Sequence, residues 1–270
     1  MAKIILLTGA TRGIGLEAAK KLASDGHTLL VHGRDRERLE TVRTLLEQLP
    51  NAGRIIPFCA DLARPHEIEA LAEAVAASCA RLDVVIHNAG VLRSPTRLTP
   101  DGLEVRFAFN TIAPYLLTKR LLARIERAGR VIAVASAAQA RVEVEALTGK
   151  RRLTELEAYA QSKLALIMWS FDLARRLPEG PAVIALNPGS LLATRMVREA
   201  FGIAGRDVQI GADALVRAAL AETFAGRSGS YYDNDSGRFA DPHPDALDAR
   251  RCAELVAHIE RLVQRKVKPE

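Results

Sequence analysis

The feature that most constrains the fold lies at the N-terminus, where a short apolar run leads into a glycine-rich turn and then a helix. Residues 3–7 (Lys-Ile-Ile-Leu-Leu) have the character of a buried parallel strand. The turn Thr8-Gly9-Ala10-Thr11-Arg12-Gly13-Ile14-Gly15 follows, and residues 13–23 have a helical pattern. This order is typical of a dinucleotide site, because glycines permit close approach of a pyrophosphate and the helix N-terminus offers free N–H groups. A plain tight turn into a helix is the alternative.

The same alternation of strand and helix continues through most of the chain. Apolar runs predict further strands at 28–32, 54–60, 82–87, 130–135, 181–186 and, more weakly, 229–233. Helical patterns lie between them at 36–49, 65–78, 99–127, 155–177 and 211–224. We therefore expect an α/β fold of the Rossmann type, a doubly wound parallel sheet of about seven strands with helices on both faces. No linker or repeat interrupts residues 1–270, which indicates a single domain.

The C-terminal part is less regular. Residues 190–205 contain Gly202 and Gly205, and we expect them to form a mobile flap beside the substrate. Residues 234–244 are rich in Asp, Gly and Pro and are expected to be loop. Residues 247–264 have the amphipathic pattern of a C-terminal helix.

The end of the second strand predicts which dinucleotide is preferred. An acidic residue there favours a free ribose 2′-hydroxyl. Here Gly33 leaves room and Arg34 can pair with a 2′-phosphate, helped by Arg12 in the turn, so we expect NADP(H) to be preferred and NAD(H) to be possible. Asp35 is better placed as the N-cap of the next helix than as a ribose ligand. Asp61, after the third strand, can contact the adenine amino group or cap its turn.

Tyr159 and Lys163 are four residues apart in the segment predicted to be helical, so they share one face. A nearby positive charge lowers the pKa of a phenol from about 10 toward the range in which proton transfer is efficient. This pair therefore predicts a general acid/base. Taken alone the spacing is weak, because many surface helices contain it by chance.

Taken in order along the chain, these motifs resemble the short-chain dehydrogenase/reductase family. The matches cover residues 3–194 and comprise the turn 8–15, Asp61, Asn88-Ala89-Gly90, Asn110, Ser136, Tyr159-x-x-x-Lys163 and Pro188-Gly189. The segments Ala158-Tyr159-Ala160-Gln161-Ser162-Lys163-Leu164-Ala165 and Gly33-Arg34-Asp35 are most similar to the retinol-dehydrogenase and protochlorophyllide-reductase-like branch, which mostly prefers NADP(H).

The resemblance implies hydride transfer between the nicotinamide and a carbonyl or alcohol carbon. Ser136 would bind the carbonyl oxygen, Tyr159 would exchange its proton, and Lys163 would lower the Tyr159 pKa and bind the nicotinamide ribose. Asn110 would hold a water that links Lys163 to solvent, or would merely brace its helix through a backbone hydrogen bond. The cofactor contacts expected are Gly9, Thr11, Arg12, Gly13, Ile14, Gly15, Arg34, Asp61, Leu62, Asn88, Ala89, Gly90, Tyr159, Lys163, Pro188, Gly189 and Thr194.

The chain departs from the family pattern in three places. The segment between Ser136 and Tyr159 is longer than in most members, and its extra residues 140–154 are expected to border the substrate. A cofactor-contacting Thr is expected at position 193, but that residue is Ala and Thr194 follows it. His87 stands where many members have Asn.

Composition limits the other function classes. The net charge of +6 comes from basic residues that match no nucleic-acid motif, so no nucleic-acid partner is expected. The three cysteines, at positions 59, 79 and 252, have no metal-ligand spacing and predict reduced, mostly buried thiols in a cytoplasmic protein without a metal site. No apolar stretch is long enough for a membrane span.

The predicted partner is a small, mostly apolar carbonyl or alcohol, enclosed by residues 138–154 and the flap. A homodimer or homotetramer is expected because the helix 155–177 is apolar around more than one face. The alternative is that the chain's own C-terminal segment covers this surplus. A second function class also stays open, a dinucleotide-binding sensor or scaffold without turnover, although such a protein would have no need of the proton-transfer residues.

Overall fold

The structure is a computed structural model that describes residues 1–267. Its strands form one sheet of eight, in the order β3-β2-β1-β4-β5-β6-β7-β8. All neighbours are parallel except β7 and β8. The strands are β1 (Ile4–Leu7), β2 (Thr28–Gly33), β3 (Ile55–Cys59), β4 (Leu82–His87), β5 (Ile125–Val134), β6 (Ala182–Asn187), β7 (Ser230–Asp233) and β8 (Arg238–Ala240). The strand order reverses between β1 and β4, so the crevice at their carboxyl ends is the place where such folds bind ligands.

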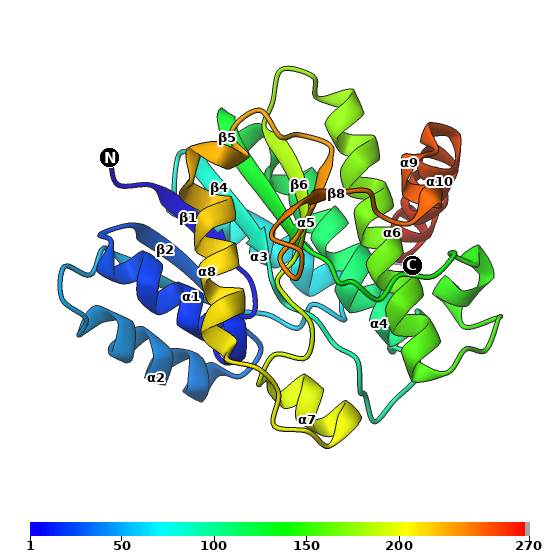
Figure 1. The fold of residues 1–270 in the computed structure, drawn as a ribbon, viewed down its shortest axis with the longest axis horizontal. Helices are drawn as coiled ribbons and strands as arrows, with labels where there is room; N and C mark the ends of the chain where they lie inside the picture. Colours follow the sequence, from blue (N-terminus) through cyan, green and yellow to red (C-terminus); the bar gives the residue numbers. More distant parts are fainter. Residues whose placement is uncertain (268–270) are drawn as a thin grey trace.

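Helices cover both faces of the sheet (Figure 1). α1 (Gly13–Ser24), α2 (Arg36–Glu47) and α8 (Val208–Leu220) bury their apolar side chains on one face. α3 (Pro65–Ser78), α5 (Ala113–Leu121), α6 (Glu155–Arg176) and α10 (Ala249–Val267) do so on the other. The short helices are α4 (Val105–Phe107), α7 (Arg195–Phe201) and α9 (Pro244–Leu247). The predicted doubly wound α/β fold is confirmed.

The eighth strand was missed because its segment, within 234–244, was expected to be loop. β7 and β8 form a hairpin around a turn at 234–237 that ends in Gly237, whose φ is +68°. The polar turn residues were recognised, but β8 is only three residues long, and its pairing of Tyr231 with Ala240 could not be read from so short a run.

The predicted continuous helix at 99–127 is wrong. Helical structure starts at α4, which Glu104 caps by accepting hydrogen bonds from two backbone N–H groups, and passes through a π-helical segment, η1 (Ala108–Ile112), into α5. Pro114 has no N–H to donate to the Asn110 carbonyl, so the α-helical hydrogen-bond ladder cannot continue there. A short 3-10 turn, η2 (Leu122–Arg124), ends the segment, and β5 begins at Ile125, five residues before the predicted start.

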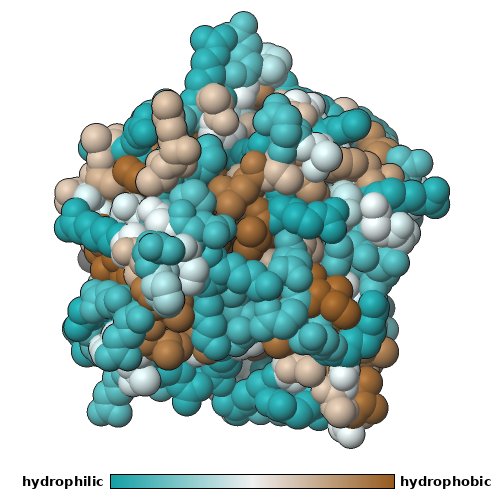
Figure 2. Space-filling view, turned by 60° about the vertical axis from the view of Figure 1, so that its left-hand side comes forward, coloured by the Kyte–Doolittle hydropathy of each residue, from teal (hydrophilic) through white to brown (hydrophobic). Residues whose placement is uncertain are grey.

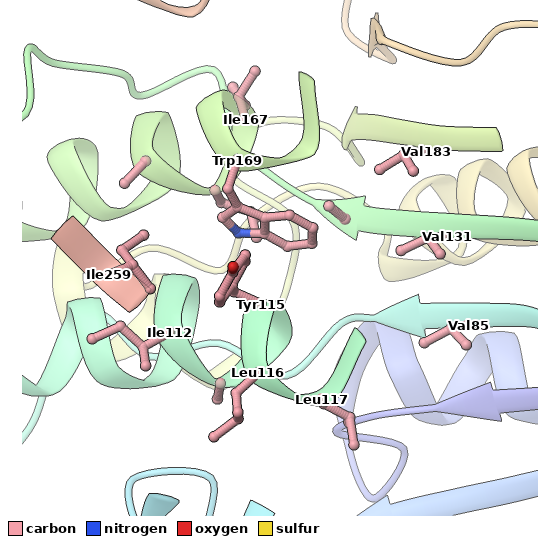
Figure 3. Close-up of a cluster of buried hydrophobic side chains, with 14 of the residues drawn as sticks. Val85, Ile112, Tyr115, Leu116, Leu117, Val131, Ile167, Trp169, Val183 and Ile259 are labelled. Atoms are coloured by element: carbon pink, nitrogen blue, oxygen red, sulfur yellow. The ribbon is translucent and has the colours of Figure 1, made fainter. Parts of the chain in front are cut away.

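The core between α5 and α6 is built around a fully buried tryptophan (Figure 3). The ring of Trp169 meets that of Tyr115 edge-on, with centroids 5.9 Å apart, and that of His87 at 6.3 Å. Such edge contacts add to the stabilisation that burial of the large side chain provides.

The surplus apolar surface of α6 is covered by α10 of the same chain. Leu255, Val256 and Ile259 of α10 are buried in the same cluster as the α6 side chains. Glu260 accepts hydrogen bonds from the Tyr115 hydroxyl (2.8 Å) and the Lys119 ammonium (2.7 Å) of α5. The feature that suggested a homo-oligomer therefore has an explanation within one chain.

Away from the core, the face seen after a 60° turn is mainly hydrophilic, with apolar side chains in small separate patches (Figure 2). No helix within residues 1–267 is long and apolar enough to cross a membrane.

Candidate active site

The glycine-rich turn after β1 leaves no room for side chains at two of its glycines. A Cβ atom on Gly15 would lie 2.2 Å from the Gly9 carbonyl oxygen. A Cβ on Gly9, whose φ is +68°, would lie 2.8 Å from the Cα of Ala89. The turn therefore packs its backbone directly against the segment that follows β4, which leaves the N-terminus of α1 open to a ligand.

Asn88 and Thr8 hold these two segments together. The Asn88 side-chain amide donates to the carbonyl oxygens of Thr8 and Gly9, both at 3.0 Å. The Thr8 hydroxyl accepts from the backbone N–H of Ala89 at 3.1 Å. Asn88-Ala89-Gly90 was predicted from the sequence as a cofactor segment, and in the structure its first two residues brace the turn. Thr8 was not predicted.

His32 braces the same turn from the other side. Its imidazole is 2% exposed, with Nδ1 accepting from the Gly9 N–H at 3.3 Å and Nε2 lying 3.0 Å from the Ala60 carbonyl oxygen. These partners fit a neutral ring with the proton on Nε2. Burial lowers the pKa of His32 to about 4, which keeps the ring neutral at physiological pH.

Basic side chains gather beside the turn. Arg12 and Arg34, both predicted, are exposed, and Arg38 and Arg195 join them. The pKa of Arg12 is lowered by partial burial and by the positive charges of Arg38, Arg195 and Arg34. Asp35 caps α2 by accepting from the Arg38 N–H at 3.1 Å, as expected. The cluster is suited to an anionic ligand with more than one phosphate.

The residues after β3 are less available to a ligand than predicted. The Asp61 carboxylate accepts from the Ala63 N–H at 3.0 Å, so it caps its own turn, which was the alternative to an adenine contact. Leu62 is only 3% exposed and packs on the face of the sheet that α3, α5, α6 and α10 cover. Its side chain is therefore not free to line the predicted cofactor site.

Ser136 and Tyr159 meet at the carboxyl end of β5. The Ser136 side chain lies within reach of the Tyr159 hydroxyl and partly opposes the rise in its pKa that burial causes. The Ser136 carbonyl oxygen accepts from the Gln139 side chain (3.1 Å) and the Tyr231 hydroxyl (3.2 Å), which fix the backbone of the serine. Neither of these supports was predicted. Together they hold two hydroxyl groups where a substrate oxygen could accept from both.

Lys163 lies next to this pair but is turned toward the backbone. Its Nζ donates to the Val134 carbonyl oxygen at 2.7 Å and lies 5.7 Å from the centroid of the Tyr159 ring. Burial lowers the Lys163 pKa to about 8. Burial raises the pKa of Tyr159, and the hydrogen bond with Ser136 only partly opposes this. Burial and Ser136 are the causes that shift the Tyr159 pKa, so the predicted lowering by Lys163 is not found.

The Asn110 side chain holds neighbouring segments together, which was the predicted alternative to holding a water. Its side-chain oxygen accepts from the Val91 N–H at 2.8 Å, and its nitrogen donates to the Val91 carbonyl and the Ser162 hydroxyl, both at 2.9 Å. A Cβ on Gly90 would lie 3.4 Å from the Asn110 oxygen and 3.5 Å from Lys163 Nζ. Asn110, Gly90 and Lys163 therefore converge on one point at the edge of the sheet.

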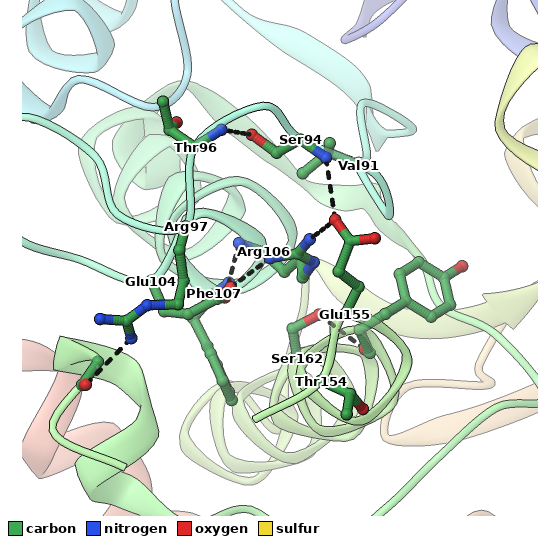
Figure 4. Close-up of polar contacts among 12 residues, drawn as sticks. Val91, Ser94, Thr96, Arg97, Glu104, Arg106, Phe107, Thr154, Glu155 and Ser162 are labelled. Carbon is green, nitrogen blue, oxygen red and sulfur yellow. Dashed lines mark hydrogen bonds and ion pairs between the residues drawn. The ribbon is translucent and has the colours of Figure 1, made fainter. Parts of the chain in front are cut away.

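A buried ionic network fixes the helices that carry these residues (Figure 4). Arg106, 3% exposed, pairs with Glu104 at 2.6 Å and donates through Nε to the Leu92 carbonyl oxygen at 2.7 Å. It also pairs with Glu155, the first residue of α6, which accepts from the Ser94 N–H at 3.4 Å. The loop after β4 and the starts of α4 and α6 are thereby held together.

After β6 the chain turns at Pro188-Gly189, where the φ of Gly189 is +124°, and enters the flap. Thr194 caps α7 by accepting from the Val197 N–H at 3.3 Å. A Cβ on Gly13 would lie 3.5 Å from the Thr194 methyl group. The one-residue displacement noted in the sequence thus still places a threonine against the glycine-rich turn.

Comparisons with known proteins agree with this geometry. The family model of the short chain dehydrogenases matches residues 3–202. Retinol dehydrogenase 13 of Homo sapiens is 30% identical, over 97% of this chain and 84% of the relative, and polyprenol dehydrogenase of Danio rerio is 30% identical, over 94% and 84%. The chain therefore belongs to the short-chain dehydrogenase/reductase family and resembles its retinol-dehydrogenase-like branch.

Solved structures give the same result. A protein from Mycobacterium paratuberculosis superimposes with a TM-score of 0.80 at 28% identity, covering 97% of this chain and 93% of its own. A short chain dehydrogenase from Burkholderia cenocepacia in complex with NADP superimposes with a TM-score of 0.68 at 27% identity, covering 86% and 95%. These matches support an oxidoreductase that uses a dinucleotide. Within residues 1–267 no group of His, Cys, Asp or Glu is arranged to hold a metal ion.

Proposed function

We propose that the protein is an NADP(H)-dependent oxidoreductase acting on a mostly apolar carbonyl or alcohol. The observation that carries this proposal is the meeting of the Ser136 and Tyr159 hydroxyls beside buried Lys163, at the sheet edge where the braced glycine-rich turn opens. The nicotinamide, when bound, exchanges a hydride with the substrate carbon.

In this mechanism the protein's residues handle the oxygen and its proton. Ser136 donates a hydrogen bond to the carbonyl oxygen, and Tyr159 gives its proton to that oxygen in reduction or takes it back in oxidation. The raised Tyr159 pKa keeps the phenol protonated at neutral pH, as a proton donor requires. Lys163 would hold the nicotinamide ribose, and its positive charge there would lower the Tyr159 pKa. Asn110, bonded to Val91 and Ser162, holds the segment after β4 beside the helix that carries Lys163.

The second candidate is a dinucleotide-binding sensor or scaffold of the same fold. The exposed basic cluster beside the turn would bind a dinucleotide in an enzyme and in a sensor alike. The Ser136–Tyr159 pair favours the enzyme, because dinucleotide binding alone requires neither hydroxyl. Tight binding of NADPH without turnover of any carbonyl compound would favour the sensor.

Cofactor choice gives the first prediction. Wild-type protein is expected to bind NADPH more tightly than NADH, and Arg34→Asp is expected to weaken NADPH binding about tenfold to hundredfold, because it exchanges a charge-assisted hydrogen bond to the 2′-phosphate for repulsion. NADH binding should change little. Fluorescence titration with both cofactors measures this, with Arg36→Asp as a control of equal charge change on α2. Equal affinity of the wild type for both cofactors would contradict the preference.

The substrate is proposed to lie between the flap and residues 138–154. Leu191, Phe201 and the additional Ile203 expose 46%, 47% and 41% of their surfaces there, which suits an apolar compound. Leu192, also expected at the substrate, is 2% exposed and packs beside Gly211 of α8. Basic residues follow residue 149, and one of them, Arg151, pairs with Glu143 at 3.0 Å on the surface. This pairing favours a solvent-exposed role for these residues over the binding of acidic substrates.

Assembly gives the second prediction. Because α10 covers α6, we now expect sedimentation at micromolar concentration to give the mass of one 29.3 kDa chain. A dimer or tetramer mass would require an interface outside the surface of α5 and α6 that α10 occupies. The expected cytoplasmic location remains a proposal that rests on the free cysteines, although Cys59 is exposed rather than buried as expected.

A further inference from the structure

The flap is closed at its neck by one carboxylate. Asp235, in the turn between β7 and β8, accepts from the Ser190 N–H (3.0 Å) and hydroxyl (2.5 Å) where the flap begins. It also pairs with Arg206 (3.0 Å) where the flap ends. Leu192 and Arg206 form a parallel bridge between the two sides of the neck. The two sides of the neck are thus joined by hydrogen bonds, an ion pair and a backbone bridge.

This neck is packed on the glycine-rich turn. Leu192 reaches toward Ile14, and both side chains close over Gly211, where a Cβ would lie 2.6 Å from Leu192 and 3.1 Å from Ile14. Thr194 lies against Gly13, the first residue of α1. The next residue along the flap, Arg195, therefore starts α7 from a position fixed beside the N-terminus of α1.

Two electrostatic effects disfavour the positive charge of Arg195 at its position. Arg195 lies in the first turn of α7, where the helix dipole favours acidic residues. Its charge also repels that of Arg12, whose pKa is lowered by burial and by the charges of Arg38, Arg195 and Arg34. Its ion pair is with Glu199 on the surface of the same helix, and exposed pairs of this kind contribute little. Positive charge held in this way is stabilised when an anion binds.

We propose that Arg195 is a phosphate ligand supplied by the flap, which binds the pyrophosphate of the dinucleotide. Gly13 and Thr194 mark the pyrophosphate end of the site, at the N-terminus of α1, whereas Arg34 follows β2, where the adenosine ribose is recognised. Arg195 therefore contributes to the affinity for both dinucleotides, and Arg34 to the choice between them. This inference rests on the proposed function, because it assumes that the turn binds a dinucleotide.

The test compares Arg195→Ala with Arg34→Ala and with Arg198→Ala, a matched control on the exposed surface of α7. Dissociation constants are measured for NADPH, NADH, ADP-ribose and adenosine 2′-monophosphate. ADP-ribose has the pyrophosphate without a 2′-phosphate, and adenosine 2′-monophosphate has the 2′-phosphate without a pyrophosphate. Arg195→Ala is expected to weaken NADPH, NADH and ADP-ribose by the same factor, about tenfold, and to leave adenosine 2′-monophosphate unchanged. Arg34→Ala should weaken NADPH and adenosine 2′-monophosphate selectively, and Arg198→Ala neither group.

Two results would overturn the inference alone. One is an Arg195→Ala protein that binds NADPH, NADH and ADP-ribose as the wild type does. The other is an Arg195→Ala protein that loses affinity only for the ligands with a 2′-phosphate. A wild-type protein that binds neither NADPH nor NADH would instead overturn the proposed function, and the inference with it.

Discussion

Tyr159→Phe is expected to lower turnover by about 10²- to 10⁴-fold, the usual contribution of a positioned general acid, while the dissociation constant for NADPH stays nearly unchanged. The phenol lies against Ser136 in the structure, where it can reach a substrate oxygen, and it has no part in the backbone turn that would hold the phosphates. Steady-state rates on a confirmed substrate, together with cofactor titration, measure both quantities.

The matched control is Tyr232→Phe. Tyr232 accepts from Arg217 at 2.6 Å and packs with Phe224 and Phe239 beneath α8, away from the site. Lys163→Ala, by contrast, should lose both turnover and cofactor affinity. A Tyr159→Phe protein with wild-type turnover would show that another group supplies the proton.

Two buried histidines are expected to lower the free energy of unfolding by about 6 kcal/mol when the pH falls from 7 to 4. Burial lowers the pKa of His32 to about 4 and that of His87 to about 3, from an ordinary value of 6.5. Below pH 6.5 the unfolded chain therefore binds protons at these histidines and the folded protein does not. The free energy of unfolding decreases as the pH is lowered. Each histidine contributes roughly 3 kcal/mol by pH 4, since each pH unit below 6.5 corresponds to about 1.36 kcal/mol.

Denaturant unfolding at a series of pH values measures this loss. His87→Asn keeps a polar group beside the Thr118 hydroxyl, 2.6 Å from His87 Nε2, but cannot titrate, so its stability should depend on pH about half as steeply. His66→Gln, which replaces an exposed histidine at the start of α3, is the control and should follow the wild type. Stability that is constant between pH 7 and pH 4 would contradict the assignment of both histidines as buried and neutral.

The fold and the outline of the site could be predicted because their signals are local. Gly9 and Gly15 are required within one turn, and Tyr159 and Lys163 lie one helical turn apart. Contacts between distant segments could not be predicted in this way. His32 joins the ends of three strands, and Thr194 of the flap lies against Gly13 of the glycine-rich turn.

Two further differences between the predictions and the structure also have physical reasons. Pro114 was included in a continuous helix although it removes the N–H that the Asn110 carbonyl would need. The position of the Lys163 ammonium was not predicted, because the sequence gives no indication that the buried Val134 carbonyl would accept its hydrogen bond.

The most direct test of the account is transfer of deuterium from NADPH labelled at C4 of the nicotinamide. Wild-type protein and Tyr159→Phe are incubated with long-chain aldehydes, aromatic ketones, steroid ketones and small oxo acids, and the alcohols formed are analysed by mass spectrometry. We predict deuterium on the carbinol carbon of at least one apolar product with the wild type, and at most a trace with Tyr159→Phe. Tight NADPH binding with no deuterium in any product would contradict hydride transfer and favour a sensor, and deuterium confined to the small oxo acids would contradict the apolar substrate site.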